Sequence, residues 1–102
     1  MKYQLVLQFS ATSMEDFDRL VALKDELIAE LNELASVDGH DFGSGEFNIF
    51  ILTNDPTECF DRAREIVTDQ DVPNAMRSAY REANGDNYVI LWPSSLKQFQ
   101  VL

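Results

Sequence analysis

The stretch Val37–Pro56, read as V-D-G-H-D-F-G-S-G-E-F-N-I-F-I-L-T-N-D-P, decides the fold of this chain. It contains the only histidine, His40, and three of the four glycines. The glycines of the segment G-S-G at 43–45 supply the positive backbone angles that a tight reversal needs. The stretch therefore predicts a hairpin whose arms are residues 35–42 and 46–53.

The second arm of this hairpin, F-N-I-F-I-L-T at Phe47–Thr53, is apolar on both faces except at Asn48 and Thr53. Strands of this kind lie in the middle of a sheet, so we expect a central strand here. Its outward-facing side chains need cover, which either the C-terminal tail or a second subunit would provide. The residues that need this cover are Val6, Phe50 and Leu52.

Upstream of the hairpin, Tyr3–Phe9 alternates in a way that predicts a half-buried strand, with Gln4 and Gln8 on a face that sees water. The hydroxyl groups within Ser10–Ser13 suit the start of a helix, because they accept hydrogen bonds from its first free amides. Apolar residues then recur at steps of three and four, and we expect one helix to about Leu34 that packs on a sheet. Members of this stripe are Phe17, Leu20, Val21, Leu27, Ile28, Leu31 and Leu34.

Downstream of the hairpin, D-P-T-E at Asp55–Glu58 predicts the start of a second helix. An aspartate cap, a proline at the first helical position and a glutamate three residues after the cap each favour this start. A shorter apolar stripe follows and fades near Asp69. Its members are Phe60, Ala63, Ile66 and Val67.

Residues 74–85 carry two conflicting patterns. Helical spacing with Gly85 as an end cap favours a helix, whereas Asn84-Gly85 before the β-prone run Tyr88–Trp92 favours a hairpin. We expect a strand at about Arg77–Glu82 that turns back into a strand at Tyr88–Trp92, followed by a tail that folds over exposed apolar surface. The residues with helical spacing are Val72, Ala75, Met76, Ala79, Tyr80 and Ala83.

The expected order of elements is strand, helix, hairpin, helix, and one or two further strands. Short connections and right-handed crossovers leave few ways to assemble this order. We expect a single α+β domain over residues 1–102, a ferredoxin-like two-layer sandwich. Its antiparallel sheet has four or five strands, and both helices lie on one face.

The charge of the chain is strongly unbalanced, with 18 acidic and 8 basic side chains and a formal net charge of −10. A field of this sign repels phosphate backbones and anionic lipids, so we expect neither nucleic acid nor membrane as a partner. The lone Cys59 forms no internal disulfide. The N-terminus lacks the continuous apolar core of a signal peptide, and no run reaches the length of a membrane span. These features predict a cytoplasmic protein.

Two parts of the chain, D-G-H-D-F-G-S-G-E-F-N-I-F-I at Asp38–Ile51 and A-Y-R with Y-V-I-L-W-P within Ala79–Pro93, resemble a pattern in small uncharacterised bacterial proteins of this size. The resemblance covers about a third of the chain and implies a compact ferredoxin-like protein. In size, acidity and expected fold, the chain is also similar to immunity proteins that neutralise secreted bacterial toxins.

The hairpin brings one imidazole and three carboxylates together, at Asp38, His40, Asp41 and Glu46. In an extended strand, alternation puts Asp38 and His40 on one face and Asp41 on the other, which opposes convergence on a metal ion. The spacing of these residues matches no familiar zinc or calcium site. We therefore expect no metal or cofactor here, and we interpret these four residues as part of a protein-binding surface, because loops on a rigid sheet often bind partners.

Two further groups are weaker candidates. Cys59 lies in the first turn of the second helix and is expected to be a buried small hydrophobe, although a nucleophilic pair with His40 is conceivable. Arg77 and Arg81, with Tyr80, suit a small carboxylate or phosphate ligand, although surface arginines more often pair with acidic side chains of the same molecule. Trp92 is expected to pack at the edge of the core.

Three classes of function follow from these features. The sequence favours a non-enzymatic, acidic protein-binding domain, most concretely an immunity-type inhibitor of a basic protein partner. The alternative is a small-ligand or regulatory domain, and a small enzyme that uses His40 or Cys59 is the third class. The apolar face of the central strand separately predicts a homodimer through Val6, Phe50 and Leu52.

Overall fold

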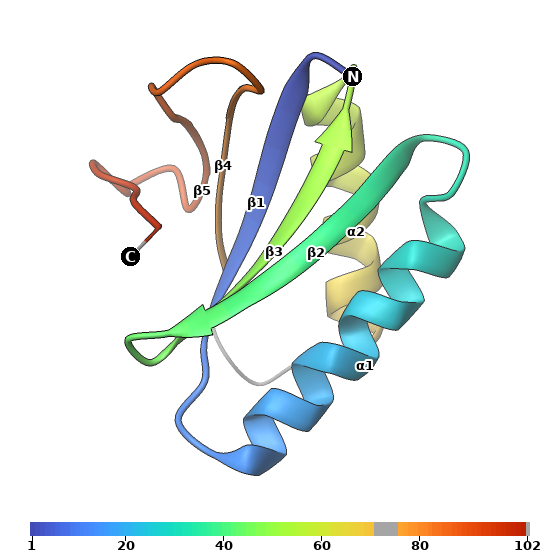
Figure 1. Cartoon of the computed structure of the whole chain (residues 1–102), viewed down its shortest axis with the longest axis vertical. Coiled ribbons are helices and arrows are strands. Elements are labelled where there is room, and N and C mark those ends of the chain that lie inside the picture. Colours follow the sequence, from blue (N-terminus) through green and yellow to red (C-terminus); the bar gives the residue numbers. More distant parts are fainter. Residues whose placement is uncertain (71–75, 102) are drawn as a thin grey trace.

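The structure, a computed structural model, describes residues 1–70 and 76–101. Within them the elements are β1 (Tyr3–Ser10), α1 (Met14–Glu30), β2 (Ala35–Gly43), β3 (Glu46–Thr53), α2 (Pro56–Asp69), β4 (Met76–Glu82) and β5 (Val89–Trp92). The strands form one antiparallel sheet in the order β2-β3-β1-β4-β5 (Figure 1). The expected ferredoxin-like α+β sandwich is therefore confirmed, with β5 added at the edge beside β4.

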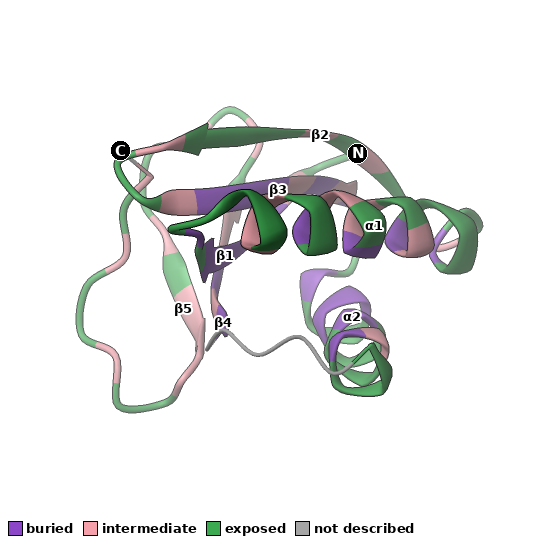
Figure 2. Cartoon of the chain, turned by 90° about the horizontal axis from the view of Figure 1, so that it is seen from below, coloured by how far each residue is buried: buried purple, intermediate pink, exposed green. Residues whose placement is uncertain are grey.

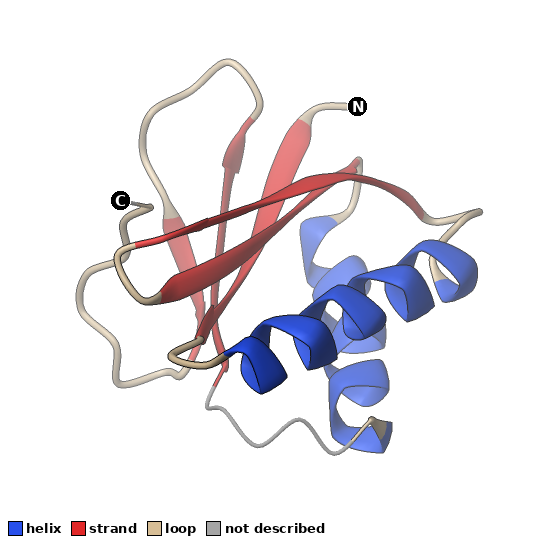
Figure 3. Cartoon of the chain, turned by 60° about the horizontal axis from the view of Figure 1, so that its bottom comes forward, coloured by secondary structure: helices blue, strands red, loops and turns tan. Residues whose placement is uncertain are grey.

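Both helices cover the same face of the sheet (Figure 3). Their buried sides and the facing side of β1 and β3 enclose the core, whereas β2 at the sheet edge is largely exposed (Figure 2). The expected central strand is β3, which lies between β2 and β1. The largest fully buried side chains of this core are Leu5, Leu7, Phe9, Leu20, Leu23, Leu27, Leu31, Phe47, Ile49 and Ile51.

The first helix begins where the sequence predicts, because the Ser13 hydroxyl accepts a hydrogen bond from the Asp16 amide. Its end differs from the prediction: α1 ends at Glu30, not near Leu34. The amides of Leu34 and Ala35 both donate to the Leu31 carbonyl, at 2.9 and 2.8 Å, and form a tight turn into β2. Apolar spacing continues through this turn because Leu31 and Leu34 still face the core, so spacing alone could not reveal where the helix stops.

The hairpin arms lie where they were predicted, and Gly43 pairs with Glu46 across a two-residue turn. The turn residues Ser44 and Gly45 have φ angles of 53° and 75°. Positive values at both positions are typical of a type I′ turn, whose twist suits a hairpin. Gly43 is not among the residues with positive φ, so the expectation that both glycines supply such angles is wrong for Gly43.

The second helix follows the prediction closely, with the Asp55 side chain accepting a hydrogen bond from the Glu58 amide and Pro56 in the first turn. The strand interpretation of the next segment is confirmed by β4 and β5. The predicted turn at Asn84-Gly85 is wrong in detail: the connection from β4 to β5 spans residues 83–88, and Gly85 has no positive φ. Val72 and Ala75, which belong to the rejected helical pattern, lie outside the described residues.

The sheet face that points away from the helices is partly covered by the chain itself. Val6 has no exposed surface, and Gln8 is only 2% exposed. The C-terminal segment after β5 reaches this face, where the backbone carbonyl of Gln100 accepts a hydrogen bond of 2.9 Å from Gln8 Nε2. The expectation that the tail covers this face is therefore supported, and the expectation that Gln8 faces water is wrong. Phe50 and Leu52 remain partly exposed.

Trp92 packs at the edge of the core as predicted, and the guanidinium carbon of Arg64 in α2 lies 4.0 Å from the centre of its ring. None of the helices among residues 1–70 and 76–101 is both long and apolar enough to cross a membrane.

Candidate protein-binding surface

A β-bulge in β2 decides how the hairpin residues are oriented. The pairing with β3 shifts between Val37 and Gly39, so that Asp38 is an extra residue in the strand. Gly39 has a φ of 153°, a conformation that side-chain-bearing residues rarely adopt. The simple alternation that placed Asp38 and His40 on one face therefore does not hold, and His40 pairs opposite the buried Ile49 on the helix-facing side.

The four predicted hairpin residues consequently do not converge. His40 lies on the helix-facing side of the sheet. Asp41, which pairs with Asn48, and Glu46 lie on the opposite face. Asp38 is exposed at the bulge. Among the described residues, no group of three or more histidine, cysteine, aspartate and glutamate side chains could hold a metal ion.

His40 belongs to an aromatic cluster at the end of the hairpin nearest to the start of α1. Its ring stacks on Phe47 with centroids 4.8 Å apart and an interplanar angle of 12°. Phe17 packs edge-on against both Phe42 and Phe47, at 5.3 and 5.5 Å. On the outer side, Lys24 Nζ lies 2.9 Å from His40 Nδ1. The imidazole is therefore held between a core phenylalanine and a lysine of α1, which is a packing role.

An apolar groove lies beside this cluster, and we name it the Phe42 groove. Its volume is about 530 Å³, and it is lined by Ala11, Thr12, Ser13, Met14, Phe17 and Phe42. Phe42 is 48% exposed and Met14 is 74% exposed. Large apolar side chains that share one exposed patch commonly mark an interaction surface. The Phe42 groove is thus a candidate interaction surface beside the hairpin turn.

The charges next to the Phe42 groove are mostly negative. The carboxylate of Asp16 accepts a hydrogen bond of 3.1 Å from the amide of Thr12, which lines the groove, and Glu15 follows the lining residue Met14 in α1. Arg19 already forms an ion pair of 2.9 Å with Glu15. An apolar centre with a charged margin is the usual anatomy of a protein interface.

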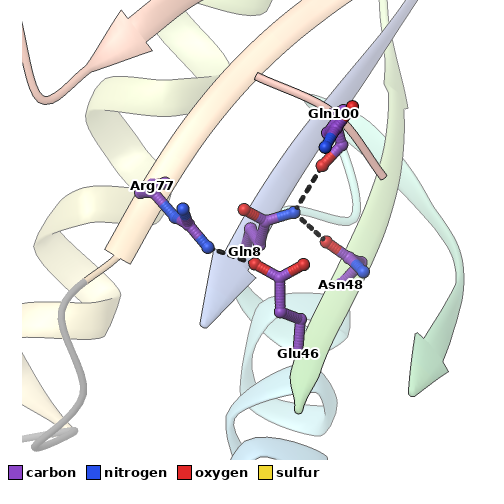
Figure 4. A network of polar contacts seen from close by, with 5 residues as sticks. All are labelled: Gln8, Glu46, Asn48, Arg77 and Gln100. Atoms are coloured by element: carbon purple, nitrogen blue, oxygen red, sulfur yellow. Dashed lines mark hydrogen bonds and ion pairs between the residues drawn. The ribbon is translucent and has the colours of Figure 1, made fainter. Parts of the chain in front are cut away.

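A polar cleft, which we name the Gln8 cleft, lies on the other side of the hairpin turn. Its volume is about 440 Å³, and it is lined by Gln8, Ser10, Ser44, Gly45, Glu46, Arg77, Gln98, Phe99 and Gln100. Figure 4 shows that Gln8 reaches both Asn48 and Gln100, while Arg77 pairs with Glu46 beside them. The C-terminal segment forms one wall of the cleft, so the site depends on residues distant in the sequence.

The three residues predicted to bind a small ligand have separate roles. Arg77 pairs with Glu46, which joins β4 to the start of β3. Arg81 donates hydrogen bonds to the carbonyls of Glu82, Ala83 and Gly85 and so holds the connection to β5. Tyr80 lies on the opposite face of β4 and packs edge-on against Tyr3, with centroids 5.7 Å apart. Of the three, Arg77 is the residue that lines the Gln8 cleft.

Cys59 is fully buried in the core, where the sequence placed it. The pKa of its thiol is raised from 9.0 to about 11, mainly by burial and also by the nearby Asp55 and Glu58 charges, against a hydrogen bond with Thr53 that lowers it. The thiol is therefore protonated at neutral pH and is a weak nucleophile. The structure also places His40 in a different group of contacts, with Lys24 and Phe47.

Comparison with known proteins assigns the chain to no family. The chain matches no protein-family model, and no curated protein is significantly similar to it. Sequence reasoning missed Phe42 and Met14 as surface residues, because an apolar residue at a strand end or helix start is ordinarily assigned to the core. The available signal was the position of Phe42 next to the turn at 44–45, near the end of its strand.

Proposed function

We propose that this chain is a non-enzymatic protein-binding domain whose acidic surface binds a basic protein partner. Its most concrete version is an immunity-type inhibitor that neutralises a toxin. The observation that carries the proposal is the exposed apolar surface at the end of the hairpin, where Phe42 is 48% exposed, in a chain of net charge −10. Charges of this density accelerate encounter with a basic partner, and apolar contact then slows its release.

Capture of partners on the immobilised domain tests this proposal. We expect a basic protein to bind at low salt and to be lost at high salt, because screening weakens attraction between exposed charges. The variant Asp38→Asn/Asp41→Asn should reduce its association rate more than Asp61→Asn/Glu65→Gln does. Both variants remove two exposed charges, but the control pair lies on α2. Equal effects of the two variants would contradict binding at the hairpin.

A small-ligand function is the second candidate, favoured by the Gln8 cleft. The cleft holds the Arg77 guanidinium and the Glu46 carboxylate, groups that bind a small carboxylate or amine. Its volume is within the range of about 300–1,000 Å³ that is common for small-ligand sites. A metabolite that raises the melting temperature of the wild type, but not of Arg77→Met, would favour this candidate over the first.

An enzyme that uses Cys59 or His40 is the least favoured class. The raised pKa of the buried Cys59 thiol opposes a nucleophilic role, and His40 contacts Lys24 and Phe47. If the chain is a binding domain, we expect the Cys59→Ala and His40→Ala variants to retain binding to the basic partner.

A further inference from the structure

We infer that the Phe42 groove binds a partner segment in which one apolar side chain is flanked by lysine or arginine. This inference rests on the proposed function and specifies the chemistry of the partner. The groove is lined almost wholly by apolar atoms, from Ala11, Met14, Phe17 and Phe42, with two hydroxyl-bearing residues at its margin. Binding to a lining of this kind is favourable only when the group that enters the groove is apolar.

The groove is pre-organised by contacts on both of its sides. On one side, Phe42 is held by its edge-on packing against Phe17 and its tilted contact with Phe47, at 5.3 and 6.4 Å. On the other side, the amide of Ala11 donates a hydrogen bond of 2.9 Å to the carbonyl of Gly45, which ties the lining segment to the hairpin turn. Because both walls are fixed before binding, a partner side chain loses little free energy to ordering them.

The charge around the groove decides between the kinds of occupant. A second copy of the chain would bring another net charge of −10 to a groove beside which the Asp16 carboxylate accepts a hydrogen bond from the amide of the lining residue Thr12, so repulsion opposes self-association. An anionic lipid surface is disfavoured for the same reason. In a segment with basic residues on either side of one apolar side chain, the apolar side chain fills the groove and the basic residues attract the surrounding negative charge.

A pair of synthetic peptides tests this inference on the intact chain. The probe is acetyl-Gly-Lys-Lys-Leu-Lys-Lys-Gly-amide, and its partner peptide carries serine in place of leucine. We expect the leucine peptide to bind about tenfold more tightly, since burial of a leucine side chain is sufficient for such a ratio. Amide chemical shifts in the protein NMR spectrum should change at residues 11–17 and at Phe42.

Substitutions distinguish the groove from other exposed apolar sites. Phe42→Ser should remove the preference for leucine, and Met14→Ser should reduce it at a residue that is 74% exposed and so contributes little to folding. Val89→Ser is the matched control, because Val89 is 50% exposed on β5, close to the 48% of Phe42. The control should retain the full preference. Retained preference in both Phe42→Ser and Met14→Ser would overturn the inference.

A third peptide, with glutamate in place of every lysine, separates failure of this inference from failure of the proposed function. If the leucine and serine peptides bind equally well, and both bind better than the glutamate peptide, the groove inference fails while the acidic binding surface stands. If the basic peptides bind no better than the glutamate peptide, both proposals fail. Concentration-dependent dimerisation that Phe42→Ser abolishes would assign the groove to a second copy and overturn the inference.

Discussion

Replacement of Gln8 by leucine tests how the open face of the sheet is stabilised. Gln8 is 2% exposed and Asn48 is 1% exposed. The Gln8 amide donates to Asn48 Oδ1 and to the carbonyl of Gln100, each at 2.9 Å (Figure 4). One side chain of β1 therefore joins β3 to the C-terminal segment, and leucine removes both hydrogen bonds while it keeps a similar volume.

The structure sets the expected magnitude. Each lost hydrogen bond costs about 1 kcal/mol, and the Asn48 carbonyl that is left buried without its donor costs about 1–3 kcal/mol more. Additional buried apolar atoms of leucine offset about 1 kcal/mol of this. We therefore expect the free energy of unfolding to fall by about 2–4 kcal/mol, which lowers the melting temperature of a domain of this size by about 10–25 °C.

Urea unfolding followed by circular dichroism measures this change. The double variant Gln8→Leu/Asn48→Leu should be more stable than Gln8→Leu alone, because it removes the orphaned carbonyl. Gln4→Leu, at a half-buried position on the same strand and face, is the control and should change stability by less than about 1 kcal/mol. A Gln8→Leu protein as stable as the Gln4→Leu protein, or strictly additive effects in the double variant, would refute the reasoning.

Three further predictions concern other parts of the chain. Gly45→Ala should destabilise the hairpin by about 1 kcal/mol, because the φ of Gly45 is 75°. Gly43→Ala should be nearly neutral, because Gly43 also lies in open space but has no positive φ. Equal losses of unfolding free energy for the two variants in urea would contradict the assigned turn. Asp55→Ala should cost about 1 kcal/mol by removing the cap of α2, which unfolding followed by circular dichroism would detect and which an unchanged midpoint would contradict. Since the pKa of Cys59 rises from 9.0 to about 11 on folding, the stability associated with its neutral thiol is complete below pH 9 and is lost as pH rises towards 11. The loss is about 1.4 kcal/mol per pH unit, so the stability difference between wild type and Cys59→Ala should shrink over this range, and a constant difference would show that the thiol does not titrate as described.

The local elements of this fold could be predicted from the sequence because each has a short-range cause. Ser13 and Asp55 accept hydrogen bonds from amides three residues ahead, and the turn at 44–45 lies between two β-prone runs. Strand, helix and hairpin order then restricted the sheet to a ferredoxin-like arrangement. Net charge is a sum over the chain, so the acidic character behind the proposed function also needed no coordinates.

The composition of the candidate surface depended on the tertiary structure. A bulge at Asp38 separated this residue from His40, and packing of the C-terminal segment buried Gln8. Phe42 is 48% exposed although its ring packs against Phe17 of α1. Sequence patterns report the environment that a residue prefers, whereas these outcomes depend on which distant segment occupies the adjacent space, and that is determined only when the whole chain packs.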